Sequence, residues 1–338
     1  GGVYSIISSS RNDEIILKDN VGGGSSIYAS GSVDRAHMAD DNNIIDLNAG
    51  VVNTTPGAST HVISANGELW VGGSVAVQGS GAENVIAMGR GSVDVYNKFS
   101  GDGVSAAHNG KNDISGGTVD ITASSGKGLA ASNGGANDIA TGGKVAILGT
   151  TSGSDSEVYG YGISASSSGT NSINADSGNV TVTGTGSGSG SRYVYGYGIS
   201  ASSSGTNSIT TESGDVTLTG KALDSNRGYS YGYGMIAEDA SSNTIATDSG
   251  SVTVTGSNSG YNSWGVGGGM HAASSGSTTT GSSNTITTNS GSVTVTGTSI
   301  GSGSTYGMNA VSFGSNSITT KSGDVTVATN GSGYGYFA

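Results

Sequence analysis

The sequence contains no cysteine and only one proline, Pro56, among its 338 residues. Without cysteine the chain has no disulfide scaffold and no cysteine-ligated zinc site. Charged residues make up 11% of the chain, less than half of the usual share. Lysine and arginine number only 12 against 24 acidic residues, which makes nucleic acid an unfavourable partner. No stretch approaches the ~18 apolar residues of a transmembrane helix.

Glycine is unusually abundant, with 63 copies, and serine, threonine and asparagine are also frequent. Such a composition is typical of a flexible, disordered chain. Here, however, the net charge of −12 is small for the length, and valine, isoleucine and methionine recur at a fixed phase. Because periodic burial can offset the entropy of ordering a glycine-rich chain, we predict an ordered protein.

Three short signatures recur in a fixed order along the chain. The first is Gly, an aliphatic residue, any residue and Ala, as at residues 162–165. The second is Asn-x-Ile, as at 207–209, and the third is Gly-x-Val-x-Val/Ile/Leu, as at 214–218. From Ile173 onward, the isoleucine of the second signature precedes the first valine of the third by seven residues in every repeat.

Each signature alternates apolar with small polar residues, which is the period of a half-buried strand. The signatures are too short for helices, and glycine separates them. Three strands per repeat of 26 to 41 residues indicate one triangular coil per repeat, paired in parallel with its neighbours at about 4.8 Å. The chirality of parallel crossovers favours a right-handed turn. We therefore predict an all-β, right-handed, three-stranded parallel β-helix of about 10–12 coils.

The asparagine of the second signature has the same inward parity as the isoleucine two residues later. A buried amide is unfavourable alone, but stacked copies can bond to one another, as in cross-β structures. We predict a structural ladder of Asn84, Asn112, Asn137, Asn171, Asn207, Asn243, Asn284 and Asn316. We also predict turns, with glycine supplying a positive φ, at the Ser-Gly pairs 177–178, 213–214, 249–250, 290–291 and 322–323.

We expect one continuous domain with three zones. Residues 1–72 are less regular and are interpreted as variant coils, whereas residues 73–148 form short coils whose third signatures lie 18, 26 and 26 residues apart. Residues 149–338 form long coils of roughly 36 residues. All added residues lie between the third strand and the next first strand, so we expect Tyr/Gly/Ser loops projecting from one edge, where solenoids commonly carry a binding face.

The two ends of the sequence fall near the same phase of the repeat and carry no obvious polar cap. Uncapped solenoid ends expose a row of unpaired strand groups. We therefore expect either a segment of a longer chain, which is the favoured interpretation, or copies that stack end to end into fibres.

Tandem units such as residues 207–220 resemble the passenger regions of Gram-negative autotransporters and haemagglutinin-type adhesins. The resemblance covers most of residues 73–338, and its repetitive motifs specify a class of proteins. It implies a right-handed β-helix at the bacterial cell surface, outer membrane-associated or released as an extracellular protein, commonly in adhesion. Because the repeat explains the catalytic patterns, we expect a non-enzymatic protein. Its partner would be a host or neighbouring-cell glycan or protein, or copies of itself.

Enzymes that degrade polysaccharides are the sharpest alternative, because many of them are β-helices. Glycoside hydrolysis needs two carboxylates about 5–10 Å apart. One region gathers suitable groups, with a site expected near Asp40, Asp41 and Asp46, and a solvated loop is the simpler interpretation. This region contains Asp34, Arg35, His37, Asp40, Asp41 and Asp46.

Other catalytic patterns are explained by the repeat. Asp248-Ser249-Gly250 is similar to a protease nucleophile motif, but Ser-Gly occupies the same slot in five repeats, as a turn. No metal site is indicated, because the histidines occupy no common repeat position, and no cofactor is predicted. The four histidines are His37, His61, His108 and His271.

Outward threonines form two files, which is the type of surface seen in ice-binding solenoids. β-branched threonine suits any exposed strand, and Ala328 interrupts the second file, so we favour the structural interpretation over ice binding. The first file is Thr181, Thr217, Thr253, Thr294 and Thr326, and the second is Thr183, Thr219, Thr255 and Thr296.

Aromatic residues recur in the segments that lengthen the coils. Tyrosine among glycine and serine suits an adaptable binding surface for a glycan or a protein. A structural ladder of stacked rings that shields the strand edge is the alternative. The candidate ligand-binding residues are Tyr159, Tyr161, Tyr193, Tyr195, Tyr197, Tyr229, Tyr231, Tyr233, Trp264 and Tyr306.

Overall fold

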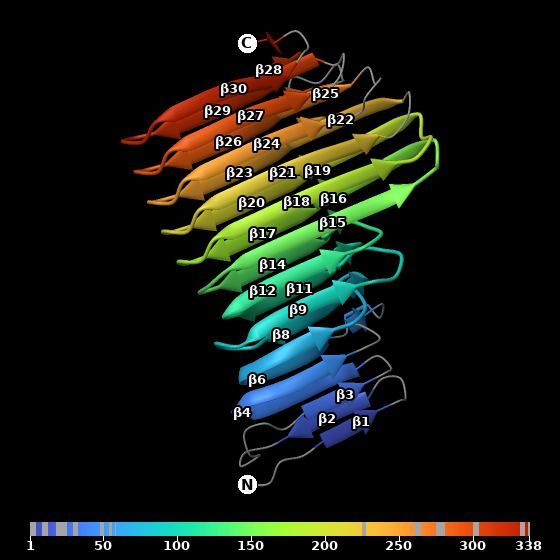
Figure 1. Cartoon of the computed structure of the whole chain (residues 1–338). Helices are drawn as coiled ribbons and strands as arrows, with labels where there is room; N and C mark the ends of the chain where they lie inside the picture. The colour runs from blue at the N-terminus through green and yellow to red at the C-terminus, as the bar shows by residue number, and fades with distance from the viewer. Residues whose placement is uncertain are drawn as a thin grey trace.

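The chain forms a rod of stacked parallel β-strands (Figure 1). The computed structural model describes residues 5–8, 13–17, 26–29, 33–47, 51–53, 56–57, 59–224, 228–259, 265–274, 281–299, 304–331 and 335–336. In these residues every regular element is a strand, and every pairing between strands is parallel. The predicted right-handed, three-stranded β-helix is confirmed. A helix long and apolar enough to cross a membrane is absent from these residues.

Three ladders of strands run along the rod. The first ladder contains β5 (Val51–Asn53), β7 (Val75–Gln78), β10 (Val104–Ala107), β13 (Leu129–Ser132), β16 (Glu157–Ser166), β19 (Tyr193–Ala201), β22 (Tyr229–Glu238), β25 (Val266–Ala273), β28 (Ser304–Val311) and β31 (Gly335–Tyr336). The second contains β2 (Asp13–Leu17), β8 (Glu83–Ala87), β11 (Lys111–Gly116), β14 (Ala136–Thr141), β17 (Thr170–Ala175), β20 (Thr206–Thr211), β23 (Ser242–Thr247), β26 (Ser283–Thr288) and β29 (Ser315–Thr320).

The third ladder completes each coil. It contains β1 (Ser5–Ser8), β3 (Ser26–Ala29), β9 (Ser92–Asn97), β12 (Thr118–Ala123), β15 (Val145–Gly153), β18 (Val180–Gly188), β21 (Val216–Asp224), β24 (Val252–Asn258), β27 (Val293–Ser299) and β30 (Val325–Gly331). Two long strands, β4 (Val33–Leu47) and β6 (Ser59–Val71), belong to both the second and third ladders. The two ladders are therefore joined into one sheet near the N-terminus.

One continuous apolar interior runs along the rod, because the inward side chains of successive coils lie in register. In the first ladder Val104 pairs with Leu129, which pairs with Ile163. These side chains belong to a single buried cluster that extends from Val51 to Val295. Burial of each large aliphatic side chain contributes roughly 1.5–3 kcal/mol, so the cluster is the main source of stability.

The second-signature asparagines form a hydrogen-bonded column inside the rod. Asn171 Nδ2 donates to Asn207 Oδ1 over 2.8 Å, and Asn207 Nδ2 donates to Asn243 Oδ1 over 2.8 Å. Each amide also donates to a carbonyl of the first ladder, as Asn207 does to Ser200 over 2.7 Å. The same bonds join Asn84, Asn112, Asn137, Asn171, Asn207, Asn243, Asn284 and Asn316 in sequence.

The Ser-Gly turns use glycine for a different reason from the one predicted. Their glycines do not have the positive φ that we expected. Instead they stack on one another, and a methyl group added at Gly214 would overlap the carbonyl of Gly178 in the neighbouring coil. Positive φ is found in the turns between the first and second ladders, at non-glycine residues such as Ser167 and Ser168.

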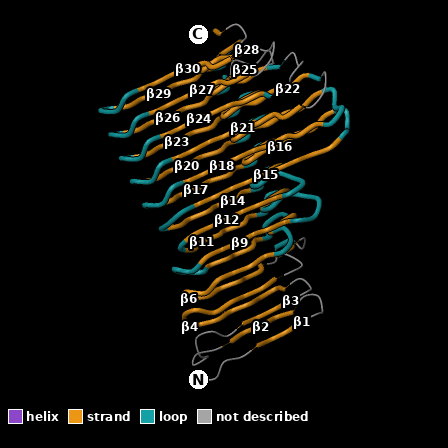
Figure 2. The backbone as a smooth tube through the Cα atoms, in the orientation of Figure 1, coloured by secondary structure: helices purple, strands orange, loops and turns teal. Residues whose placement is uncertain are grey.

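The long coils are wider because their strands are longer, which corrects the expectation of projecting loops. Figure 1 shows the rod broadening from β15 onward, and Figure 2 shows strand across most of the added width. The ends of β15, β18, β21, β24 and β27 pack against the beginnings of β16, β19, β22, β25 and β28. We call this two-layered extension the wing.

Glycine allows the two layers of the wing to approach closely. In β18 the inward positions of the extension are Gly184, Gly186 and Gly188, and all three are buried. A methyl group at Gly184 would overlap the carbonyl oxygen of Tyr197, and one at Gly196 would overlap that of Lys221. The layers are thus in backbone contact, so a side chain does not fit between them at these positions.

Candidate functional site

The predicted tyrosines lie on one layer of the wing, on strands β16, β19, β22 and β28. In the sequence Tyr195-Gly196-Tyr197-Gly198, the strand period of two places glycine against the other layer and tyrosine on the outside. The register stacks equivalent tyrosines of successive coils into columns. We call this outer surface the tyrosine face.

The innermost column is largely buried. Tyr197 and Tyr233 are only 8% and 6% exposed, and they form an apolar cluster with Ile236, an outward residue of β22. Their rings therefore cover the outer side of the first ladder. Tyr161 begins this column.

The column continues across Gly268 to Tyr306, because Gly268 occupies the register position between Tyr233 and Tyr306. The hydroxyls of Tyr233 and Tyr306 lie 3.3 Å apart, and a methyl group at Gly268 would crowd both rings. The ring of His271 stacks on Tyr233 at a centroid distance of 5.2 Å. Burial lowers the pKa of His271, so this imidazole favours its neutral form.

The outer columns consist of nearly parallel rings. Tyr159 stacks on Tyr195 with centroids 4.5 Å apart, and Tyr195 stacks on Tyr231 at 5.2 Å. At the rim, Tyr193 stacks on Tyr229 at 5.3 Å. Since these distances are close to the strand spacing of about 4.8 Å, the rings cover one another's faces along the rod. Their edges and hydroxyl groups are left toward solvent, with Tyr159 38% and Tyr229 40% exposed.

Charged groups border the tyrosine face. The Tyr159 hydroxyl donates to Glu157 over 2.7 Å. The Arg192 guanidinium lies 5.2 Å from the centre of the Tyr193 ring, and Lys127 Nζ lies 5.1 Å from that of Tyr161, so both make cation–π contacts. Burial, reinforced by neighbouring tyrosines and Glu157, raises the pKa of Tyr195 to about 12. The Tyr195 phenol therefore stays neutral at physiological pH.

The structure brings together nine of the ten predicted tyrosine-face residues, and Trp264 lies outside the described residues. The prediction that these tyrosines lie on loops was wrong, since they lie on strands. The strand signal was present in the alternation of tyrosine with glycine, and the glycine content obscured it.

The acidic region considered for polysaccharide chemistry falls on β4. The side chains of Asp34, Arg35, His37, Asp40, Asp41 and Asp46 lie outside the described part of the structure. In the part that is described, no group of three side chains could hold a metal ion.

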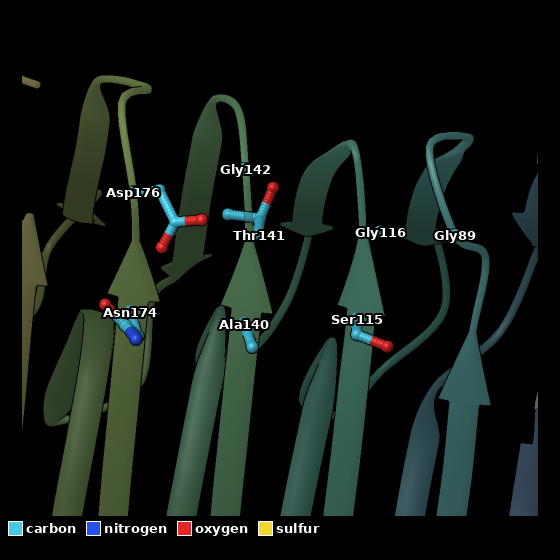
Figure 3. Close-up of a pocket in the computed structure, with 8 residues that line it drawn as sticks. All are labelled: Gly89, Ser115, Gly116, Ala140, Thr141, Gly142, Asn174 and Asp176. Atoms are coloured by element: carbon cyan, nitrogen blue, oxygen red, sulfur yellow. The ribbon is translucent and has the colours of Figure 1, made fainter.

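Two shallow pockets follow the edge where second-ladder strands turn toward the third ladder. One, of about 260 Å³, is lined by small residues such as Ala140 and by Asp176 (Figure 3). The other, of about 340 Å³, adds Glu212 and Asp248 from the next two coils. The serines of this edge are engaged in the turns, since Ser249 Oγ donates to the Glu212 carbonyl over 3.3 Å.

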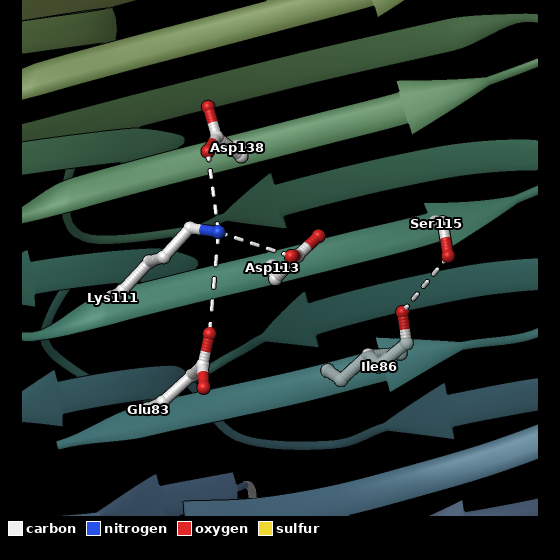
Figure 4. A network of polar contacts seen from close by, with 6 residues as sticks. All are labelled: Glu83, Ile86, Lys111, Asp113, Ser115 and Asp138. Atoms are coloured by element: carbon white, nitrogen blue, oxygen red, sulfur yellow. Dashed lines mark hydrogen bonds and ion pairs between the residues drawn. The ribbon is translucent and has the colours of Figure 1, made fainter.

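Charged side chains of the short coils pair on the outer surface of the second ladder. Lys111 Nζ lies 3.1 Å from Asp113, 3.5 Å from Asp138 and 4.0 Å from Glu83 (Figure 4). The hydrogen bond to Asp113 raises the pKa of Lys111, which stays charged. This cluster neutralises itself in part and is a solvated ion network.

The threonine files lie in register on the third ladder. Thr181 pairs with Thr217, Thr217 with Thr253 and onward to Thr294 and Thr326. The second file runs beside it from Thr183 to Thr296 and meets Ala328.

Comparisons with protein-family models, with curated proteins and with solved structures found no match for this chain.

Proposed function

We propose that the chain is a non-enzymatic, structural and adhesive β-solenoid, exposed on or secreted from a bacterial surface, and that its tyrosine face binds a glycan of a host or neighbouring cell. The resemblance of its repeats to autotransporter and haemagglutinin-type adhesins supports the location. The tyrosine face supports the binding role.

One observation carries the proposal. The short coils close a complete apolar core without a wing, and the inward residues of the long coils continue the same cluster. The wing is thus an addition that the core does not require. What it adds is a set of partly exposed tyrosines in columns, which is a surface suited to recognition.

The form of the tyrosine face favours a polar ligand. Because neighbouring rings cover one another's faces, a ligand would contact ring edges and phenol hydroxyls. Each hydroxyl can both donate and accept a hydrogen bond. The hydroxyl-rich surface of a glycan matches such a row. Repetition along the rod would let a polymeric glycan engage several coils at once.

A double variant that removes hydroxyls but keeps rings tests the proposal. Tyr195→Phe with Tyr231→Phe should leave the thermal unfolding temperature nearly unchanged and weaken cell or glycan adhesion about tenfold, since two hydrogen bonds are lost. The companion Tyr195→Ser with Tyr231→Ser removes rings as well, and Thr217→Ala with Thr253→Ala on the third ladder is the matched control. Unchanged adhesion in both tyrosine variants, with stability lost in the serine pair, would show that the stacks are structural only.

A further inference from the structure

A second patch of exposed aromatic side chains lies on the outer surface of the third ladder, where β6 of the N-terminal region pairs with β9 of the short coils. Trp70 on β6 and Tyr96 on β9 are 50% and 49% exposed. They point outward because the residues that alternate with them, such as Leu69 and Val95, are buried. We call the outward residues Glu68 and Trp70 of β6, Asp94 and Tyr96 of β9, Asp120 of β12 and Ala146 of β15 the third-wall patch.

Strand register fixes the arrangement of the patch. Trp70 pairs with Asp94, and Asp94 pairs with Asp120, so these three side chains follow one another along the rod about 4.8 Å apart. Tyr96 lies two residues beyond Asp94 on the same strand, about 7 Å away on the same face. Asp94 therefore lies next to Trp70 of the preceding coil and Tyr96 of its own strand, and Asp120 follows Asp94 in the next coil.

The same ladder in the long coils has a different surface. The column that contains Trp70, Asp94 and Asp120 continues into Ala146 and then into the threonine file. Threonine satisfies an exposed strand position without a large apolar surface. Because an exposed indole beside an exposed phenol contributes little to the core and is unfavourable in water, the patch has the character of a binding surface.

The patch carries an excess of negative charge. Glu68, Asp94 and Asp120 contribute three carboxylates, and Lys144 Nζ lies 3.3 Å from Asp120 Oδ1. Partial burial raises the pKa of Asp94, and the charges of Asp120 and Glu68 raise it further, although the Ser92 hydrogen bond and Lys144 act in the opposite direction. A cationic group placed between these carboxylates would relieve the repulsion.

We propose that the third-wall patch binds an amino-sugar polymer whose amino groups are free, such as a β-linked glucosamine chain. The apolar C–H faces of the sugar rings pack on Trp70 and Tyr96, and the ammonium groups pair with Asp94 and Asp120. A neutral glycan leaves the carboxylates uncompensated, and a simple cation leaves the aromatic surface unused. A chain that is sugar and cation together matches both halves of the patch.

Binding of a glucosamine oligomer to the intact chain, measured by calorimetry, tests this site. Trp70→Ala and the pair Asp94→Asn with Asp120→Asn should each weaken binding at least about tenfold. Thr217→Ala, in the same column of the third ladder but in a long coil, should bind like the unmodified chain. All variants change outward residues, so unchanged thermal unfolding is expected and should be verified.

Two further probes separate sugar recognition from charge attraction. A fully N-acetylated oligomer of equal length and a lysine oligomer of equal charge should both bind at least about tenfold more weakly than the free-amine sugar. Equal binding of the lysine oligomer, or of the N-acetylated oligomer, would overturn the proposal. The Tyr195→Phe and Tyr231→Phe pair distinguishes the two surfaces: loss of glucosamine binding in this pair, with binding retained in Trp70→Ala, would place the sugar on the tyrosine face and overturn the proposal.

Discussion

The short coils between β7 and β14 and the long coils from β15 onward share an interior and differ at one corner. Inward aliphatic residues and the asparagine column pass from one region into the other without a break in register. The long coils add a wing at the junction of the third and first ladders. The core positions thus set the fold, whereas the glycine-lined strand extensions change the outer surface and leave the core unchanged.

The largest loss of stability should come from a break in the asparagine column, which the two regions share. Asn207→Leu in a long coil leaves the Oδ1 of Asn243 and the carbonyl of Ser200 without their donor, and it removes the acceptor of Asn171. Since all of these groups are buried, we expect a loss of about 2–3 kcal/mol in the free energy of unfolding. Denaturant unfolding monitored by circular dichroism would measure it.

Asn112→Leu in a short coil should produce a similar loss, because its amide donates to Asn137 and to Ser105 in the same way. Asn174→Leu is a suitable control, since Asn174 is exposed on β17 next to the column. A large loss for Asn207→Leu with none for Asn112→Leu would contradict the view that one interior serves both regions.

An intermediate loss of stability should follow from a substitution in the wing alone. In Gly196→Ala the added methyl group overlaps the Lys221 carbonyl oxygen, so the layers must separate. We expect about 1–3 kcal/mol of destabilisation, with a weaker tyrosine signal in near-ultraviolet circular dichroism. Gly142→Ala is the control, because nothing lies within 4 Å of the added methyl group. Equal behaviour of the two variants would mean that the layers are not in backbone contact.

The smallest effect should be a difference in alkaline stability between the two regions. Burial raises the pKa of Tyr197 and Tyr233 above the ordinary value of 10.0, and that of Tyr195 to about 12. The unfolded chain therefore loses protons first, so the stability from these phenols is complete below pH 10 and falls as the pH rises. Tyrosinate absorbance and unfolding should be followed together.

Tyr197→Phe with Tyr233→Phe should reduce this dependence on pH. Hydrogen exchange would locate the loss, which is expected in the wing and not in the short coils. If amide protons lost protection from exchange uniformly along the rod, the loss of stability at alkaline pH would belong to the whole molecule and not to the wing.

The interior could be predicted from the sequence because its physical requirements repeat. Residues such as Ile173 and Ile209 must be apolar and must return at one phase, and the asparagine two positions earlier must have copies above and below. Patterns of this kind specify the ladders directly. They also indicate parallel pairing, since equivalent positions align only in that arrangement.

The periphery could not be predicted as well because glycine there has several uses. In Ser213-Gly214 the glycine suggested a turn with positive φ, but it is needed for the close approach of neighbouring turns. In Tyr195-Gly196-Tyr197 the glycine concealed a strand. A single sequence does not distinguish a glycine that frees the backbone from one that makes room for another backbone.

The third-wall patch was missed for another reason. Asp94 and Asp120 each occupy the outward position of the third signature, but Trp70 precedes the first copy predicted, at Val75, which the structure places in the first ladder. Each residue alone is unremarkable on an exposed strand. Only register between coils that are far apart in sequence shows that they are neighbours.

Because the rows of the wing stack in register, the affinity of the proposed glycan-binding face could change in steps over evolutionary time. The coils of β16, β19 and β22 each contribute one row to the tyrosine columns, so duplicating or deleting one of these coils changes the number of rows while the remaining rows keep their spacing. For a polymeric ligand, each further row acts at high effective concentration once the first has engaged, and avidity rises without any new kind of contact. The number of binding rows on the surface therefore depends on the number of these repeats.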